Sequence, residues 1–226
     1  MGWTEWIRGE AEVEPSLYAA DFARLGDQVR ELLAAGARIF HFDVGDGHFI
    51  PPVTIGPVVL RSIAPLVHDA GGVFDCHLMV TDPAHHFPEI ASSGGDSVTF
   101  HVEATDDPGG VAAAARAHGL GVGVVFNPGT SPEEAAAFAE AAGADLVLCM
   151  SIQPGYSGQA FMSEALGRIA RLAELVSCPI QVDGGVGESN ARDVRDAGAR
   201  LLVAGSAIFA DPDPAAAYRR IVTAAK

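Results

Sequence analysis

The sequence predicts an α/β protein built as a single (β/α)8 TIM barrel, and three observations support this fold class. Short runs typical of β-strands alternate with longer Ala-rich helical stretches over the whole chain of 226 residues. Eight pairs of strand and helix leave roughly 28 residues for each pair, the size of a compact βα repeat. The sequence also has no linker-like or low-complexity segment between the pairs. One closed parallel barrel accommodates all eight.

The individual elements are predicted from their composition and from the glycines between them. Gly36, Gly94, Gly119, Gly143 and Gly198 each follow a helical run and precede a strand, which is typical of a glycine that ends a helix. We expect strands near residues 12–18, 37–43, 73–79, 96–102, 120–126, 145–150, 179–183 and 200–204. We expect helices near residues 21–35, 56–68, 82–93, 107–118, 131–142, 160–176, 188–197 and 212–224. An open doubly wound sheet uses the same units and is the alternative, although the GxGxxG fingerprint of that fold is missing.

Charge and lysine content exclude several classes of protein. The chain has 14 Lys and Arg residues against 29 Asp and Glu residues, and its net charge of −15 opposes binding to nucleic acid or to anionic membranes. Its one lysine is Lys226, the last residue. Enzymes that need a buried lysine as a Schiff-base nucleophile or as a cofactor anchor are therefore excluded.

The cysteines and the apolar runs indicate a cytoplasmic protein. Cys76, Cys149 and Cys178 are odd in number and lack CxxC spacing, which fits a reducing compartment, and we interpret all three as small core residues. The first residues have no apolar run typical of a signal peptide, and no stretch of the chain is long and apolar enough to span a membrane.

The first residues of the chain differ in character from the repeats. We divide the chain into an N-terminal extension, residues 1–11, and a catalytic barrel, residues 12–226. Trp3 and Trp6 of the extension would either cover the bottom of the barrel or contact a second subunit in a homo-oligomer.

Polar residues at inward positions of the predicted strands are informative, because branched apolar side chains normally fill a barrel interior. Successive side chains of a strand point to opposite faces, so His41 and Asp43 share one face of the second strand. His77 takes an inward position in the third strand and Asp183 in the seventh. All four would point to the same mouth of the barrel. Two imidazoles and two carboxylates suit one divalent metal ion, and Zn, Mn, Fe and Co all accept this ligand set.

Asp43 and Asp183 suit a second role beside metal binding. Inverting a carbon next to a ketone needs one group that removes a proton from one face and another that delivers a proton to the opposite face. A metal on the ketone and the adjacent hydroxyl would stabilise the enediolate formed between these transfers. The alternative is that the four polar residues are unrelated buried groups satisfied by hydrogen bonds. His101 and Glu103 end the fourth strand with inward parity, either as outer neighbours of the site or as structural residues.

Glycines in three loops predict a phosphate site beside these residues. QPGYSGQAF at 153–161 follows the sixth strand, DGG at 183–185 ends the seventh and AGS at 204–206 ends the eighth. Loops after the seventh and eighth strands of such barrels frequently hold phosphate through backbone N–H groups. Backbone donors would let an acidic, nearly lysine-free protein hold a phosphate dianion. The alternative for each loop alone is that a turn needs its glycine.

Spaced motifs from about residue 12 to residue 220 resemble those of ribulose-phosphate 3-epimerases, in the same order. The motifs are PSLYAADFARLG (15–26), HFDVGDGHFIPPVTIGP (41–57), DCHLMVTDP (75–83), HVEAT (101–105), NPGT (127–130), MSIQPGYSGQAF (150–161), VDGGV (182–186) and VAGSAIF (203–209). The resemblance implies a (β/α)8 barrel that interconverts D-ribulose 5-phosphate and D-xylulose 5-phosphate, a step of the pentose phosphate pathway, through a metal-stabilised enediolate.

The same resemblance implies roles for individual residues. The metal ligands would be His41, Asp43, His77 and Asp183, with Asp43 the proton acceptor and Asp183 the proton donor. The residues that contact the substrate would be Ser16, His77, Met79, Met150, Gly155, Tyr156, Ser157, Gly158, Gly184, Gly185, Gly205 and Ser206. Those from Gly155 onward in this list would surround its phosphate.

The chain departs from the family pattern around the expected substrate pocket. Gly45 stands where family members usually have Met, in DVMDGHF, so one wall of the pocket would be missing. Residues 50–52 and 154–158 replace the usual VPN and PGFGG, and Ala19 replaces a serine. A larger pocket would admit a hexulose phosphate such as D-allulose 6-phosphate, which is the alternative substrate.

Two further alternatives belong to other functional classes. A barrel that binds a sugar phosphate without turning it over would be a sensor, although Asp43 and Asp183 are both present. A metal-dependent aldolase would use the same enediolate chemistry but would cleave the ketose into smaller products.

Overall fold

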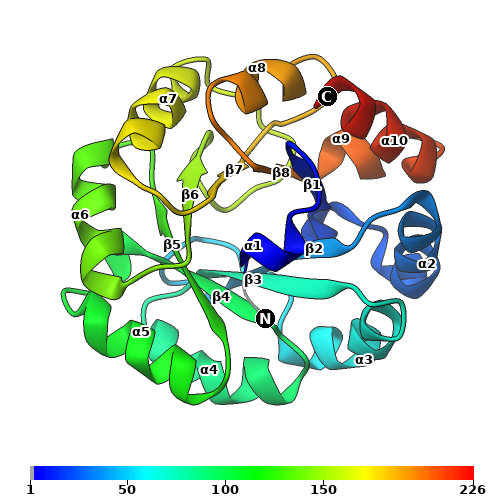
Figure 1. Cartoon of the computed structure of the whole chain (residues 1–226). Coiled ribbons are helices and arrows are strands. Elements are labelled where there is room, and N and C mark those ends of the chain that lie inside the picture. Colours follow the sequence, from blue (N-terminus) through cyan, green and yellow to red (C-terminus); the bar gives the residue numbers. More distant parts are fainter. Residues whose placement is uncertain (1–2) are drawn as a thin grey trace.

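Eight parallel strands alternate with helices around one barrel in the computed structural model, which describes residues 3–226 (Figure 1). The strands are β1 (Glu12–Pro15), β2 (Ile39–Gly45), β3 (Val73–Met79), β4 (Ser97–His101), β5 (Gly121–Phe126), β6 (Leu146–Met150), β7 (Ile180–Asp183) and β8 (Leu201–Ala204). The helices are α1 (Trp3–Trp6), α2 (Leu25–Ala35), α3 (Pro57–His68), α4 (Pro83–Ser92), α5 (Pro108–Ala117), α6 (Pro132–Ala142), α7 (Ala165–Leu175), α8 (Ala191–Asp196), α9 (Ser206–Phe209) and α10 (Pro214–Ala224). The predicted TIM barrel is confirmed, and the open sheet is excluded.

The pairing of the strands places the polar residues of neighbouring strands side by side. The strands follow the order β1-β8-β7-β6-β5-β4-β3-β2, and a parallel bridge between Ser16 and His41 joins the two ends of this order. β2 pairs with β3 so that Asp43 lies opposite His77. Because side chains alternate along a strand, this register brings both residues to the interior at one level.

Near the mouth of the barrel, two of the predicted helices begin later than expected, because residues before them hydrogen-bond the segments that follow β6 and β7. The predicted helix at 160–176 begins at Ala165, since the Met162 N–H donates to the Ser151 carbonyl oxygen at 3.0 Å. The predicted helix at 188–197 begins at Ala191, since the Asn190 side chain hydrogen-bonds the loop that follows β7. These residues therefore shape the mouth of the barrel instead of extending the helices.

The chain around the first strand also differs from the prediction. β1 ends at Pro15, and residues predicted to continue the strand to 18 form a short 3₁₀ helix, Leu17–Ala19. A second 3₁₀ helix, Phe22–Arg24, precedes α2, and Asp21 begins it by accepting a hydrogen bond from the Ala23 N–H at 3.0 Å. The short helices α1 and α9 lie outside the predicted helices.

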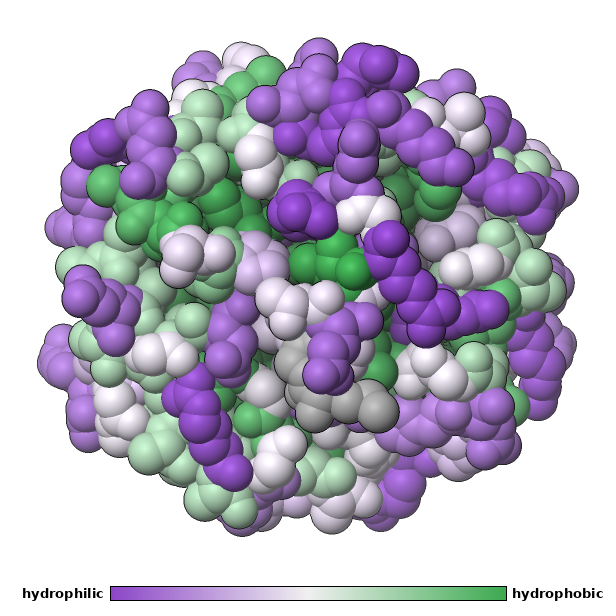
Figure 2. Space-filling model, viewed as in Figure 1, coloured by the Kyte–Doolittle hydropathy of each residue, from purple (hydrophilic) through white to green (hydrophobic). Residues whose placement is uncertain are grey.

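The N-terminal end of the barrel is closed by α1, which lies across the middle of the barrel in Figure 1. Trp3 is only 2% exposed and packs against Ile39, Leu146 and Leu201, the first residues of β2, β6 and β8. The interpretation of Trp3 as a cover for the barrel bottom therefore agrees with the structure, whereas residues 1–2 of the predicted extension lie outside the described residues. Hydrophilic side chains are spread over this face among smaller hydrophobic areas (Figure 2).

The core lies mainly between the outer faces of the strands and the helices, and contains Cys76 and Cys149. Cys178 is only half-buried, since it lies at the edge of the core between α7 and β7, so its interpretation as a core residue holds in part. In residues 3–226, no helix combines the length and the apolar composition that crossing a membrane requires.

Candidate active site

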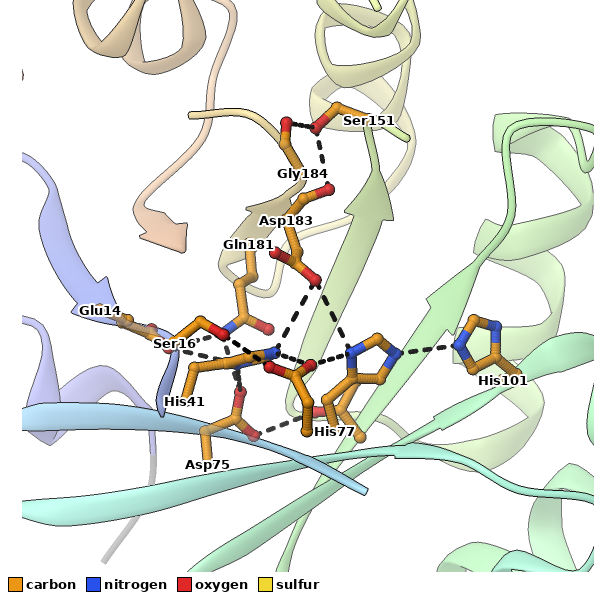
Figure 3. Close-up of polar contacts among 12 residues, drawn as sticks. Glu14, Ser16, His41, Asp75, His77, His101, Ser151, Gln181, Asp183 and Gly184 are labelled. Atoms are coloured by element: carbon orange, nitrogen blue, oxygen red, sulfur yellow. Dashed lines mark hydrogen bonds and ion pairs between the residues drawn. The ribbon is translucent and has the colours of Figure 1, made fainter. Parts of the chain in front are cut away.

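Four side chains from three strands converge at the C-terminal end of the barrel. β2 supplies His41 and Asp43, β3 supplies His77 and β7 supplies Asp183, which reaches toward the two histidines (Figure 3). Asp43 Oδ1 lies 3.3 Å from His41 Nε2 and 3.1 Å from His77 Nδ1. Asp183 Oδ2 lies 4.0 Å and 3.8 Å from the same two nitrogens. One ligand atom from each residue lies within 4.8 Å of the others, so the four could hold one metal ion.

The chemistry of these donors fits a divalent transition metal. His41 Nε2 is buried and makes no hydrogen bond to any part of the chain that the structure describes. The other nitrogen of that ring, Nδ1, lies 3.1 Å from Asp75 Oδ2, so Asp75 can accept its proton and leave the Nε2 lone pair free. Two imidazole nitrogens and two carboxylate oxygens form a ligand set that such metals accept.

The two aspartates of the site differ in their affinity for protons. In the metal-free protein, burial opposes the ionisation of Asp43, but the positive charge of His41 and the close contacts with the His41 and His77 rings outweigh it and hold the Asp43 pKa well below its usual range. Burial and the negative charge of Asp43 raise the pKa of Asp183 to about 6. Before a metal binds, Asp43 is therefore ionised and free to accept a proton, whereas Asp183 is the aspartate that more readily carries one.

A buried polar layer lies directly below His41. Its Nδ1 lies 3.8 Å from Glu14 Oε2, in addition to the contact with Asp75. Gln181 donates from Nε2 to Glu14 at 2.7 Å and to Asp75 at 2.8 Å, and Ser97 donates to Asp75 at 3.0 Å. Burial is the main reason that the pKa of Glu14 rises to about 7, and the charge of Asp75 adds to it. This layer connects β1, β3 and β7 beneath the candidate metal site.

A different chain of contacts leads away from His77. Its Nε2 lies 2.9 Å from Nε2 of His101, which is fully buried in β4. His101 Nδ1 lies 3.2 Å from Glu103 Oε2. Both residues, left between two interpretations by the sequence, are therefore outer neighbours of the site. Burial lowers the pKa of His101 to about 4 despite its contact with Glu103.

The candidate substrate pocket opens beside the four converging residues. Among the predicted substrate residues, those that line it are Ser16, Met79, Met150, Gly155, Tyr156, Ser157, Gly158, Gly184, Gly185, Gly205 and Ser206, together with Asp43 and Asp183. His77 is buried behind this lining. Tyr18, Ile152, Val186 and Val203 also line the pocket and were not predicted, because apolar or aromatic residues at strand and loop ends look like core in a sequence.

The turn after β7 lines the pocket and packs closely against the loop after β6, which requires glycine at both of its positions. Gly184 and Gly185 have φ values of 120° and 65°, which favour glycine, and a Cβ on Gly185 would lie 2.5 Å from the Phe161 nitrogen. Ser151 holds the turn through hydrogen bonds from its hydroxyl to the carbonyl oxygens of Asp183 and Gly184, at 2.9 Å and 2.6 Å. Among the described residues that line the pocket there is no Lys or Arg, so backbone N–H groups and hydroxyls are its donors.

The pocket wall beside Gly45 is present, contrary to the expectation from the sequence. A Cβ on Gly45 would lie 2.6 Å from Ile50 Cδ1, so the Ile50 side chain already fills this space. Ile50 is buried and also lies next to Gly155 of the pocket lining. The loop is held in place by Thr54, which accepts from the Gly45 N–H and donates to the Asp43 carbonyl oxygen, both at 2.7 Å. Gly45 therefore does not enlarge the pocket.

Comparison with known proteins identifies relatives over nearly the whole chain. A profile described as the ribulose-phosphate 3 epimerase family matches residues 12–209. The ribulose-phosphate 3-epimerase of Mycobacterium tuberculosis is 39% identical over 210 residues, which cover 91% of this chain and 89% of that protein. The ribulose-phosphate 3-epimerase of Escherichia coli is 36% identical over 215 residues, which cover 93% of this chain and 92% of that protein.

A solved structure agrees with the fold. The 3-hexulose-6-phosphate synthase structure has a TM-score of 0.75 and 22% identity, and the match covers 95% of this chain and 100% of that one. This likeness supports the barrel architecture alone, whereas the sequence relatives support the family. The chain therefore belongs to the ribulose-phosphate 3-epimerase family of carbohydrate isomerases.

Proposed function

We propose that this protein is a metal-dependent 3-epimerase that interconverts D-ribulose 5-phosphate and D-xylulose 5-phosphate, with one aspartate removing a proton from C3 and a second aspartate delivering a proton to the opposite face. The observation that carries the proposal is the convergence of two imidazole nitrogens and two carboxylates beside a pocket whose hydrogen-bond donors are neutral. The names of its relatives support the same reaction. A cytoplasmic location and assembly into a homo-oligomer stay predictions.

The metal would be held by His41, Asp43, His77 and Asp183. When bound, a divalent ion supplies Lewis acidity that favours negative charge on the ketone and hydroxyl oxygens of the substrate. The rest of the reaction depends on the side chains of the chain itself.

The two aspartates would work from opposite sides of the sugar. Asp43, which is ionised, would accept the proton from C3 and leave an enediolate, and Asp183, whose raised pKa lets it carry a proton, would deliver that proton to the other face. Ser16 donates a hydrogen bond to Asp43 Oδ2 at 2.7 Å, which orients the carboxylate and leaves Oδ1 toward the histidines. In the reverse direction the two aspartates exchange roles.

The phosphate would bind among the turn after β7, the loop after β6 and the residues that follow β8. These loops present N–H groups and hydroxyls from Gly184, Gly185, Ser157 and Ser206. Because Ile50 fills the space beside Gly45, this position gives no support to a longer hexulose substrate, and the pentulose is preferred.

Proton NMR in D₂O tests this proposal directly. D-ribulose 5-phosphate incubated with Zn²⁺-loaded protein should gain deuterium at C3 and give D-xylulose 5-phosphate. Asp183→Asn, measured at saturating Zn²⁺, should lower the epimerisation rate by about 10²–10⁴-fold, because the proton donor is removed. The proposal is wrong if folded, Zn²⁺-loaded wild type gives neither signal, or if the variant binds the ketose and turns it over as fast as the wild type.

A further inference from the structure

His77 belongs to a continuous chain of hydrogen-bonding groups that ends near the protein surface. Its Nδ1 faces the candidate metal site, and its Nε2 faces His101 Nε2 at 2.9 Å (Figure 3). The two rings stack with centroids 5.1 Å apart and an interplanar angle of 28°. The next contact, from His101 Nδ1 to Glu103 at 3.2 Å, ends the chain on a side chain that is 27% exposed.

Glu103 has the properties of a fixed negative end. Its Oε1 accepts hydrogen bonds from the Asn127 N–H at 2.9 Å and from the Thr130 hydroxyl at 2.5 Å. Partial burial opposes ionisation, but hydrogen bonds from His101, Thr130 and Asn127 hold its pKa at about 2. An ionised carboxylate only accepts hydrogen bonds, so the contact between Glu103 and His101 needs a proton on His101 Nδ1.

The proton on His101 Nδ1 determines the positions of the protons on both the His101 and the His77 ring. A neutral imidazole carries one proton, so with Nδ1 protonated, His101 presents a lone pair at Nε2. Two nitrogens 2.9 Å apart need one proton between them, and that proton must then belong to His77 Nε2. The 3.1 Å contact of His77 Nδ1 with ionised Asp43 would otherwise need a proton, and a bound metal ion would replace that proton. His77 would then present a lone pair on Nδ1, on the side of Asp43 and Asp183.

We propose that Glu103 is a positioning residue that acts through His101 to hold His77 with its proton on Nε2, so that the Nδ1 lone pair faces the metal. This inference rests on the proposed metal site and adds two residues to its support. Outer partners of metal-bound histidines commonly set the tautomer and orientation of the ring in this way. Here the partner acts across a second histidine rather than by direct contact.

Replacing Glu103 by Gln should reverse the tautomers of His101 and His77. The Gln oxygen is occupied by the Asn127 and Thr130 donors, so its amide N–H group would face His101 Nδ1. His101 would then carry its proton on Nε2, and His77 would turn a protonated Nδ1 toward the site. We expect Glu103→Gln to lower the affinity for Zn²⁺ by about 10–100-fold, measured on the full chain by competition with a chromophoric chelator.

A matched control removes the same charge from an exposed residue. Glu140 lies on the exposed face of α6, and Glu140→Gln should bind Zn²⁺ like the wild type. Equal affinity of Glu103→Gln and wild type would overturn the inference while leaving the proposed metal site in place. Failure of the wild type itself to bind Zn²⁺ would reject the proposed metal site, and the inference with it.

The tautomers can also be observed without any substitution. In ¹⁵N-histidine-labelled, Zn²⁺-loaded wild type, NMR should find the proton of His101 on Nδ1 and that of His77 on Nε2. A proton on His101 Nε2 would overturn the inference. A purely structural role for Glu103 predicts no particular tautomer, and this measurement stands even if Glu103→Gln does not fold.

Discussion

The two histidines of the candidate metal site face the same point but have opposite kinds of support. The support of His41 is closed, since Asp75 and Glu14 around its Nδ1 are both fully buried. The support of His77 is open, since it passes through His101 to a carboxylate that water reaches. Both arrangements can fix a histidine tautomer, but they place very different demands on the fold.

Burying two carboxylates beside one imidazole is costly unless hydrogen bonds compensate for lost water. Gln181 provides two such bonds, one to each carboxylate. Even so, the atoms Glu14 Oε1 and Gln181 Oε1 are buried without a hydrogen-bond partner in the described part of the chain. The closed network therefore ties the stability of the barrel to the metal site, whereas changes at the open network should alter metal binding with little loss of stability.

Breaking the closed network should have the largest effect. In the wild type, one carboxylate oxygen of Asp75 accepts a hydrogen bond from Gln181 and contacts His41 Nδ1. Asp75→Asn can place an NH₂ group there, so the buried donors of Gln181 and His41 lose their acceptor. We expect the free energy of unfolding of the metal-free protein to fall by about 3–5 kcal/mol, measured by urea denaturation. Glu103→Gln should cost only about 1 kcal/mol in the same assay. Similar losses in the two variants would contradict the contrast between the networks.

The period of two along each strand predicts several inward residues of this site. It identified His41, Asp43 and His77 as inward neighbours, and the barrel then placed Asp183 across the mouth. The same period makes Asp75 inward, two residues before His77. This period does not predict which inward residues meet across the barrel, because those contacts depend on the register and tilt of strands that are far apart in the sequence.

The wall made by Ile50 illustrates a second limit of the sequence. The sequence of β2 alone predicts a gap beside Gly45, but the loop after β2 turns back and fills it. An antiparallel bridge between Asp46 and Val53 and the hydrogen bonds of Thr54 determine this path. Loops have no periodicity from which such a return could be predicted, so the four metal-site residues were easier to find than the shape of the pocket.

Glu14 should give the closed network a characteristic dependence on pH. Its pKa is raised from about 4.5 to about 7 in the folded, metal-free protein, so the folded state binds this proton more tightly than the unfolded state. The contribution of Glu14 to stability is therefore greatest below pH 4.5 and is lost as the pH rises to 7. Glu14→Gln does not titrate, so its stability relative to the wild type should increase over this range by on the order of 2 kcal/mol. A constant difference from pH 4.5 to 7 would show that Glu14 is not held protonated.

Glu103 should show the opposite dependence on pH, with a smaller amplitude. Its folded pKa of about 2 lies below the ordinary value of 4.5, so its contribution to stability is present above pH 4.5 and is lost as the pH falls toward 2. The advantage of the wild type over Glu103→Gln should therefore be constant from pH 7 to 5 and shrink by about 1 kcal/mol below pH 4.5, because water screens this carboxylate. Denaturation of both variants and the wild type across pH 3–7 compares the two networks in one experiment. The difference in stability between variant and wild type should change with pH in opposite directions for the Glu14 and Glu103 variants. If both differences changed in the same direction, one of the two carboxylates would not have the charge inferred for it, and the distinction between a closed and an open support would fail.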